Sequence, residues 1–186
     1  MLYCNVPYAP VSHEKDLGWA YNNFMKKLAD DDWACFLDHD AMFTTATWYQ
    51  QIEKAIEDTK YGLIYCMTNR IFPTVQKFKN VDQSNHDIKY HRTIGRRVQE
   101  HYGAKIVDYN MSQYLPSGVC IIMSKQAWKT TGGFKSGFLS IDNDIAVKCT
   151  KSNIKVGLMK GLYVYHWYRG DGTGPKPGAG YTSHIM

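Results

Sequence analysis

Short apolar runs, each about the length of one strand, constrain the fold of this chain more than any other feature. Three of them are WACFL at 33–37, LIYCM at 63–67 and VCIIM at 119–123. Such a run is too short for a buried helix, and it lacks the alternation of a strand that has one face in water. Each run therefore predicts a strand that is buried on both faces. Helical patterns separate the runs, so the chain is expected to form an α/β sheet with helices packed on its faces.

The helical segments have apolar residues at a spacing of three or four. A capping box of Thr47 with Gln50 predicts one helix start, and Ser124 is expected to cap a short helix that ends at a glycine pair. The acidic run at 30–32 is interpreted as a solvated loop, and 71–84 as a loop without regular structure. The remaining expected elements are a first strand at 1–6, helices within 13–32, 46–59, 85–102 and 141–153, and closing strands at 155–161 and 162–169.

Composition limits the class of protein. The 186 residues are 44% hydrophobic and 14% aromatic, which indicates a folded domain, here expected up to residue 169. No apolar run is long enough to span a bilayer, so we expect a cytoplasmic protein with at most peripheral membrane contact. The five cysteines show no metal-binding spacing and are interpreted as buried thiols in a reducing compartment. A glycine- and proline-rich tail at 170–186 is expected to be a flexible lid or a frayed terminus.

Two carboxylates follow the first of the apolar runs. Asp38 and Asp40 stand at i and i+2, so in an extended chain their side chains point the same way at the end of a strand. Ligands of open α/β sheets bind at the carboxyl ends of strands, and paired carboxylates repel each other unless a cation lies between them. Oxygen ligands favour Mg²⁺ or Mn²⁺, which commonly bind substrate phosphates. The pair therefore predicts a metal–diphosphate site; the alternative is that Asp38 caps a turn and Asp40 is solvated.

Later residues supply further candidates. Asp142 and Asp144 stand at the start of a predicted helix, where carboxylates are favoured for capping alone. His166 ends the last apolar run, where it is either a third metal ligand or a structural histidine. Arg169 follows it and could contact a phosphate.

The order of these features resembles that of GT-A-fold glycosyltransferases, in particular family 2 enzymes and the carboxy-terminal region of galactosyltransferases. The stretch LGWAYNNFMKKLADDDWACFLDHDAMF resembles the family's helix and strand that lead into a D-x-D motif. The stretch SGVCIIMSKQAWKTTGGFKSGFLSIDNDIAVK resembles its acceptor-side segment. The resemblance covers most of the chain, from about Asp16 to Arg169. It implies a compact GT-A-like mixed sheet flanked by helices, in a single catalytic domain over 1–169.

The resemblance also implies roles for single residues. Asp38 and Asp40 match the motif that holds Mn²⁺ or Mg²⁺ and the ribose and diphosphate of the donor, His166 matches a later metal ligand, and Asp142 falls at the catalytic base. The residues that fall near the nucleoside are Tyr8, Trp19 and Asn22. The implied activity is transfer of a sugar from a UDP- or GDP-sugar to a hydroxyl of a saccharide or other acceptor, inverting and non-processive.

The sequence also departs from the family pattern. Ile141 stands where the family has Glu, and only one strand precedes the first helix, so base recognition is not predicted. A nucleotidyltransferase and a non-catalytic nucleotide- or sugar-binding module remain alternatives, although the first would normally open with a glycine-rich phosphate loop. A basic helix that carries Lys89, Arg92, Arg96 and Arg97 is interpreted as solvated, and no nucleic-acid partner is expected.

Overall fold

Every predicted apolar run forms a strand in the computed structural model, which describes residues 1–167. Arg169 and the tail at 170–186 lie outside the described residues. Among those described, no helix combines the length and the apolarity needed to cross a bilayer. In chain order the elements are β1 (Leu2–Asn5), η1 (Val11–His13), α1 (Leu17–Lys26), β2 (Trp33–Leu37), β3 (Ala41–Phe43), α2 (Trp48–Ile56), β4 (Tyr61–Thr68), η2 (Thr74–Gln76), α3 (Ile88–Tyr102), β5 (Ile106–Asp108), β6 (Cys120–Ser124), α4 (Lys125–Thr131), α5 (Ile141–Lys151) and β7 (Lys155–His166).

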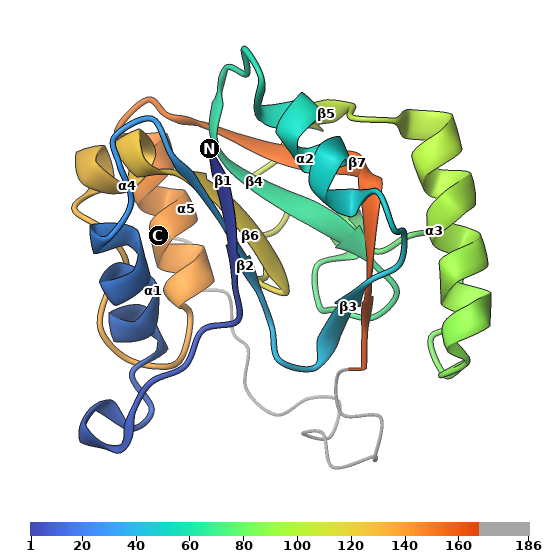
Figure 1. The fold of residues 1–186 in the computed structure, drawn as a ribbon, viewed down its shortest axis with the longest axis horizontal. Helices are drawn as coiled ribbons and strands as arrows, with labels where there is room; N and C mark the ends of the chain where they lie inside the picture. Colours follow the sequence, from blue (N-terminus) through green and yellow to red (C-terminus); the bar gives the residue numbers. More distant parts are fainter. Residues whose placement is uncertain (168–186) are drawn as a thin grey trace.

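The strands form one mixed, seven-stranded sheet with helices on both of its faces (Figure 1). Its order is β1-β2-β6-β4-β7-β3, and β5 also pairs with β7. Strand β6 runs antiparallel to both of its neighbours, whereas β1 is parallel to β2 and β4 is parallel to β7. The expected α/β sheet with helices on its faces is thereby confirmed.

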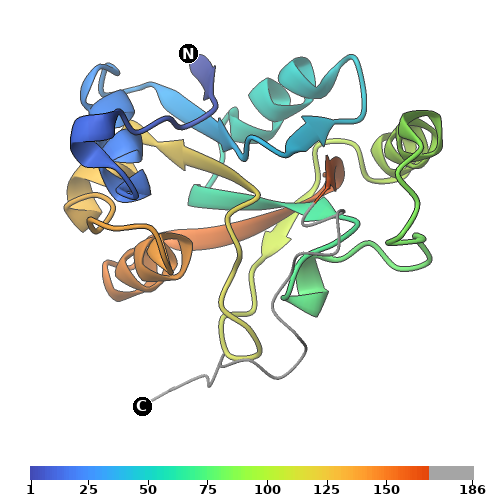
Figure 2. The same ribbon diagram turned by 90° about the horizontal axis from the view of Figure 1, so that it is seen from below.

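Alternate residues of the central strands point to two separate cores. Phe36 and Tyr65 pack on the face that is covered by α1, α4 and α5, whereas Cys35 and Ile64 pack on the face that is covered by α2. Figure 2 shows α1, α4 and α5 gathered together, with α2 on the opposite side of the sheet and α3 beyond its far end. Burial on both faces explains why these runs are apolar without alternation.

The two expected closing strands are one continuous strand, β7. Its first half pairs with β4 and β5, and its second half pairs with β4 and β3. A register shift opposite Cys66 and Met67 lets it stay paired to β4 along its length. The loop predicted at 71–84 contains one 3-10 turn, η2.

Three local predictions are wrong, and for the first of them a distant group competes for the side chain. Thr47 makes no capping hydrogen bond, since its hydroxyl is paired with the amide of Gln99 in α3. Asp32 is buried rather than solvated: it accepts a hydrogen bond from the Ala29 amide and pairs with the terminal amine at 3.1 Å. Cys4 is exposed, while the other four thiols are buried as expected. The cap at Ser124 is confirmed, because its hydroxyl accepts from the amide of Ala127.

Gly18 lets α1 approach the loop after α4. A Cβ atom built on it would lie 1.7 Å from the carbonyl oxygen of Lys135. Helix propensity alone would make Gly18→Ala stabilising by up to about 1 kcal/mol. The clash with the backbone outweighs this gain. We therefore expect Gly18→Ala to lower the unfolding free energy, measured by urea denaturation, by about 1–3 kcal/mol or more. Asn23→Ala in the same helix is the control and should change the unfolding free energy little; equal stability of both variants would show that α1 does not dock as described.

His91 in α3 is fully buried and neutral. Its Nδ1 lies 2.8 Å from the Tyr163 hydroxyl, which donates to it, and its Nε2–H donates to the Asn85 carbonyl oxygen at 2.7 Å. Burial is the largest influence and lowers the pKa of His91 below 6.5. The nearby titratable groups that act on it are His86, which also lowers the pKa, and Asp87 and Asp82, which oppose the shift.

A pH dependence of stability follows from this lowered pKa. Below pH 6.5 the unfolded chain binds a proton at this position that the folded chain resists, so the folded state loses stability as the pH falls. We expect the unfolding free energy to fall less between pH 7 and 5 in His91→Gln than in the wild type. Chemical denaturation over that range measures the two slopes, with exposed His101 replaced by Gln as the control. Parallel slopes in wild type and His91→Gln would contradict the assignment.

Candidate functional site

Two neighbouring aspartates and a histidine far along the chain meet where β2, β3 and β7 end or begin. Asp38 follows β2, Asp40 precedes β3, and His166 is the last residue of β7. Strand β3 pairs antiparallel with β7, with Ala41 opposite His166, and the amide of Trp167 donates to the carbonyl oxygen of Asp40 at 2.9 Å. One side-chain donor atom from each of Asp38, Asp40 and His166 lies within 4.8 Å of the other two. We refer to these three residues as the Asp–Asp–His cluster.

Asn69, immediately after β4, holds the histidine in place. Its buried carboxamide accepts from the backbone N–H of His166 at 2.8 Å and donates to the backbone carbonyl of His166 at 3.2 Å. The side chain of Asn69 thus pairs with the backbone of His166 as a further residue of strand β4 would, and it lengthens the pairing of β4 with β7 by one residue. Sequence reasoning missed Asn69; a buried-strand pattern that continues directly into an Asn is a signal that could have pointed to it.

The imidazole orientation is fixed from its other side. His166 Nδ1 lies 2.8 Å from the carbonyl oxygen of Arg70, and a carbonyl can only accept, so the proton sits on Nδ1. The other nitrogen, Nε2, lies 3.4 Å from Asp40 Oδ1: it donates to that carboxylate when the ring carries a second proton, and it offers a lone pair when the ring is neutral. A backbone carbonyl behind the ring and a lone pair in front of it is the arrangement found at histidines that bind metals.

The two carboxylates differ in their electrostatics. Burial is the main cause that raises the pKa of Asp38 to about 6, and the negative charges of Asp40 and Asp142 add to the shift while His166 opposes it. The contact with His166 Nε2, a hydrogen bond when that nitrogen carries a proton, is the main cause that lowers the pKa of Asp40. Asp38 is thus a partly buried carboxylate that lacks enough positive charge around it, which a bound cation would supply.

Asp142 lies close to the cluster, across the segment Gly118–Val119. Its Oδ2 accepts from the Gly118 amide at 2.8 Å, and the Val119 carbonyl accepts from the Asp38 amide at 3.0 Å. A Cβ atom on Gly118 would come within 3.0 Å of the Asp142 side chain, so glycine permits this approach. Burial raises the pKa of Asp142, and the amides of Asn143 and Gly118 oppose the shift.

Tyr21 of α1 is a further candidate site residue; the sequence pattern had placed it only on the apolar face of its helix. Its ring is buried against Phe36 and Phe134. Burial, followed by the charges of Asp38 and Asp142, raises its pKa well above 10.0, so its hydroxyl stays protonated near both carboxylates.

Two of the three residues expected near the nucleoside are engaged in other contacts. Tyr8 is 77% exposed in the loop after β1, and Trp19 stacks on His13 with ring centroids 4.1 Å apart. The Asn22 side chain donates to the Phe134 carbonyl and accepts from the Phe134 amide and the Trp128 indole. Asn22 thus fixes the Gly-Gly-Phe turn after α4.

Comparison with known proteins adds no identification: no protein-family model matches the chain, and no curated protein matches it.

Proposed function

We propose that this protein is a metal-dependent glycosyltransferase that moves a sugar from a UDP- or GDP-sugar to a hydroxyl of a saccharide or other acceptor. The observation that carries the proposal is the Asp–Asp–His cluster at the carboxyl ends of β2 and β7, with Asp142 across one backbone segment from it. The mixed sheet flanked by helices is compatible with the GT-A architecture that the sequence resembles. The free thiols of the described residues agree with a reducing compartment, for which we propose the cytoplasm.

The cluster fits a divalent cation through the chemistry of its donors. Two carboxylates and one imidazole suit Mn²⁺, while Mg²⁺ prefers oxygen ligands and would rely more on Asp38 and Asp40. The raised pKa of Asp38 indicates a place for positive charge, and His166 Nε2 faces the same place and can act as a ligand in the neutral ring. When bound, the cation would supply a Lewis acid that stabilises negative charge on the departing nucleoside diphosphate.

The remaining chemistry belongs to the side chains. Asp142 would accept the proton of the acceptor hydroxyl while the oxygen forms a bond to the anomeric carbon and the bond from that carbon to the diphosphate breaks. Attack from the face opposite the leaving group inverts the configuration, and a single transfer is expected. Tyr21 would donate a hydrogen bond within the site, and its raised pKa keeps that proton in place.

A non-catalytic nucleotide-sugar-binding module is the second candidate, favoured by one observation on Asp142. Both of its oxygens already accept hydrogen bonds, Oδ2 from Gly118 and Oδ1 from the Asn143 amide. A carboxylate oxygen can accept more than one bond, so this does not prevent it from taking a proton, but it also suits a purely structural group.

A thermal-shift screen of UDP, GDP and other nucleoside diphosphates, with and without Mn²⁺, tests the proposal. We expect one diphosphate to raise the melting temperature only when Mn²⁺ is present, because the cation joins the carboxylates to the phosphates. The corresponding nucleotide sugar is then assayed for turnover. Metal-dependent binding without turnover on any acceptor would favour the binding module, and stabilisation by no diphosphate would refute both.

Asn69→Ala tests the support of the histidine without removing a ligand. We expect Mn²⁺ affinity, measured by calorimetry, to fall by about tenfold to hundredfold, because the ring loses the group that fixes its backbone. Thr74→Ala, in the 3-10 turn that follows, is the control and should leave the affinity unchanged. Unaltered Mn²⁺ binding in a folded Asn69→Ala protein would show that His166 is not held for metal binding.

A further inference from the structure

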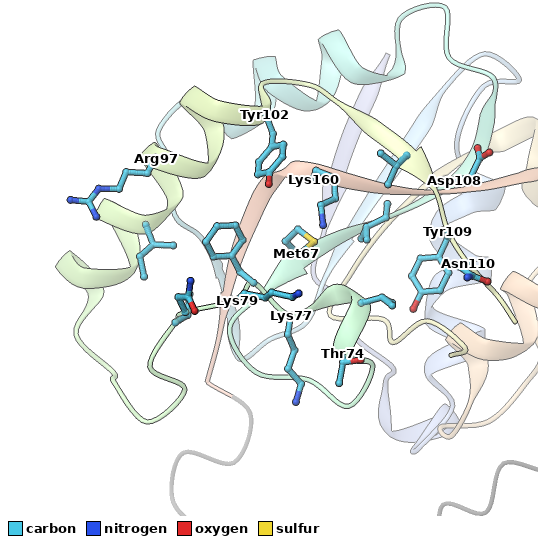
Figure 3. A pocket seen from close by; sticks show the side chains of 17 residues that line it. Met67, Thr74, Lys77, Lys79, Arg97, Tyr102, Asp108, Tyr109, Asn110 and Lys160 are labelled. Carbon is cyan, nitrogen blue, oxygen red and sulfur yellow. The ribbon is translucent and has the colours of Figure 1, made fainter. Parts of the chain in front are cut away.

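A cavity that none of the three residues of the Asp–Asp–His cluster lines is found between α3, the segment 74–81 and strands β5 and β7 (Figure 3). Its volume is about 770 Å³, which is within the range of sites for small organic ligands. Much of the lining is apolar: Met67, Phe78, Val81, Ile94, Val107 and Leu158. Tyr102 and Tyr109 add two more rings to the wall. A ligand that fills this space would need an apolar body, and the rings suit an aromatic one.

Cations dominate the polar part of the lining. Lys77, Lys79, Arg97 and Lys160 contribute to it, and Asp108 is the one acid among the lining residues. Figure 3 shows Lys79 and Lys160 extending toward the middle of the cavity, whereas Arg97 points away from it. Asp108 is already engaged outside: it accepts from the Tyr61 hydroxyl at 2.7 Å and pairs with Lys60 at 3.6 Å.

Among the described residues, no acidic side chain neutralises the positive charges of Lys79 and Lys160. Within residues 1–167, no hydrogen bond or ion pair joins the ammonium group of Lys79 or Lys160 to another side chain. Burial, followed by the positive charge of Lys79, lowers the pKa of Lys160. Lys160 is half-buried and Lys79 is exposed, and their two positive charges repel each other. A dianion between the two ammonium groups would remove that repulsion.

We propose that this cavity binds an organic phosphate monoester, with its phosphate between Lys79 and Lys160 and its ring body on the apolar floor. A phosphate monoester carries close to two negative charges at neutral pH, which matches two ammonium donors, and Lys binds phosphate as a point charge without a fixed geometry. The site does not depend on the proposed transfer reaction or its metal.

Calorimetric titration in metal-free buffer with 2-naphthyl phosphate, 2-naphthol and inorganic phosphate tests the site. The ester should bind at least about tenfold more tightly than either half alone, because only the ester uses both the ammonium groups and the floor. Lys79→Gln and Lys160→Gln should each weaken the ester by about tenfold, the equivalent of one charge-assisted hydrogen bond. Lys54→Gln on α2, on the other face of the sheet, removes the same charge and should change binding by less than about twofold.

The melting temperature of the ligand-free protein provides a second measurement on the same variants. Lys160→Gln should not lower it, since the variant removes a repulsion and breaks no pair among the described residues. Absence of ester binding by the folded wild type, equal affinity for 2-naphthol, or equal weakening by Lys54→Gln would each overturn the proposal.

Discussion

Asp40→Ala is expected to abolish the stabilisation of the protein by Mn²⁺ together with a nucleoside diphosphate. Asp40 Oδ1 lies 3.4 Å from His166 Nε2, and its lowered pKa keeps it ionised at neutral pH, so it is a ready anionic ligand. Loss of a direct ligand should cost at least as much as loss of a supporting group, so Mn²⁺ affinity should fall by about hundredfold or more. Isothermal titration with Mn²⁺, followed by thermal shift with the diphosphate, measures both effects.

The ligand-free Asp40→Ala protein should remain folded. Removal of this carboxylate takes away one of the negative charges that raise the pKa of Asp38, which offsets the lost contact with His166. Asp31→Ala removes the same charge from an exposed position and serves as the control for a general change in charge. If Mn²⁺ with the diphosphate stabilised Asp40→Ala as much as the wild type, the assignment of the Asp–Asp–His cluster as the metal site would be wrong.

Asp142→Asn is expected to reduce turnover by about 10²-fold to 10⁴-fold while donor binding changes little. An Asn amide cannot take the proton of the acceptor hydroxyl, but it has nearly the same shape as the carboxylate, and Asp142 is not one of the proposed metal ligands. Steady-state kinetics give the first quantity, and titration with the nucleotide sugar in the presence of Mn²⁺ gives the second. Retained donor binding also shows that the variant is folded.

Asp144→Asn is the matched control, since Asp144 lies on the same first turn of α5. Its carboxylate pairs with Lys148 at 2.9 Å within the helix, and it should contribute nothing to proton transfer. Unchanged turnover in Asp142→Asn would remove it as the base. Simultaneous loss of stability and donor binding would instead assign it the structural role that its hydrogen bonds to Gly118 and Asn143 suit.

The sequence predicted those parts of the fold that depend on local pattern. Continuous apolar runs identified β2, β4 and β6, because a strand buried on both faces has no polar alternation to obscure it. The positions of Asp38 and His166 at strand ends followed directly from where those runs stop. The cap at Ser124 was correct because no distant group competes for its hydroxyl.

Features that depend on long-range pairing could not be predicted. Strand β3 has only three residues and exists because it pairs with β7, far along the chain, which also brings Asp40 to His166. Asn69 acquires its role only when β7 continues past the end of β4. Thr47 fails to cap α2 for the same kind of reason, since its partner Gln99 belongs to another helix. In each of these three cases the partner lies far along the chain, where a local pattern carries no information about it.

Crystals grown with Mn²⁺ and the preferred nucleoside diphosphate, measured at a wavelength where manganese scatters anomalously, test the central claim most directly. The account predicts an anomalous peak in contact with carboxylate oxygens of Asp38 and Asp40 and with Nε2 of His166, with phosphate oxygens completing its coordination. A peak at any other position, or a bound diphosphate with no manganese at these three side chains, would contradict it.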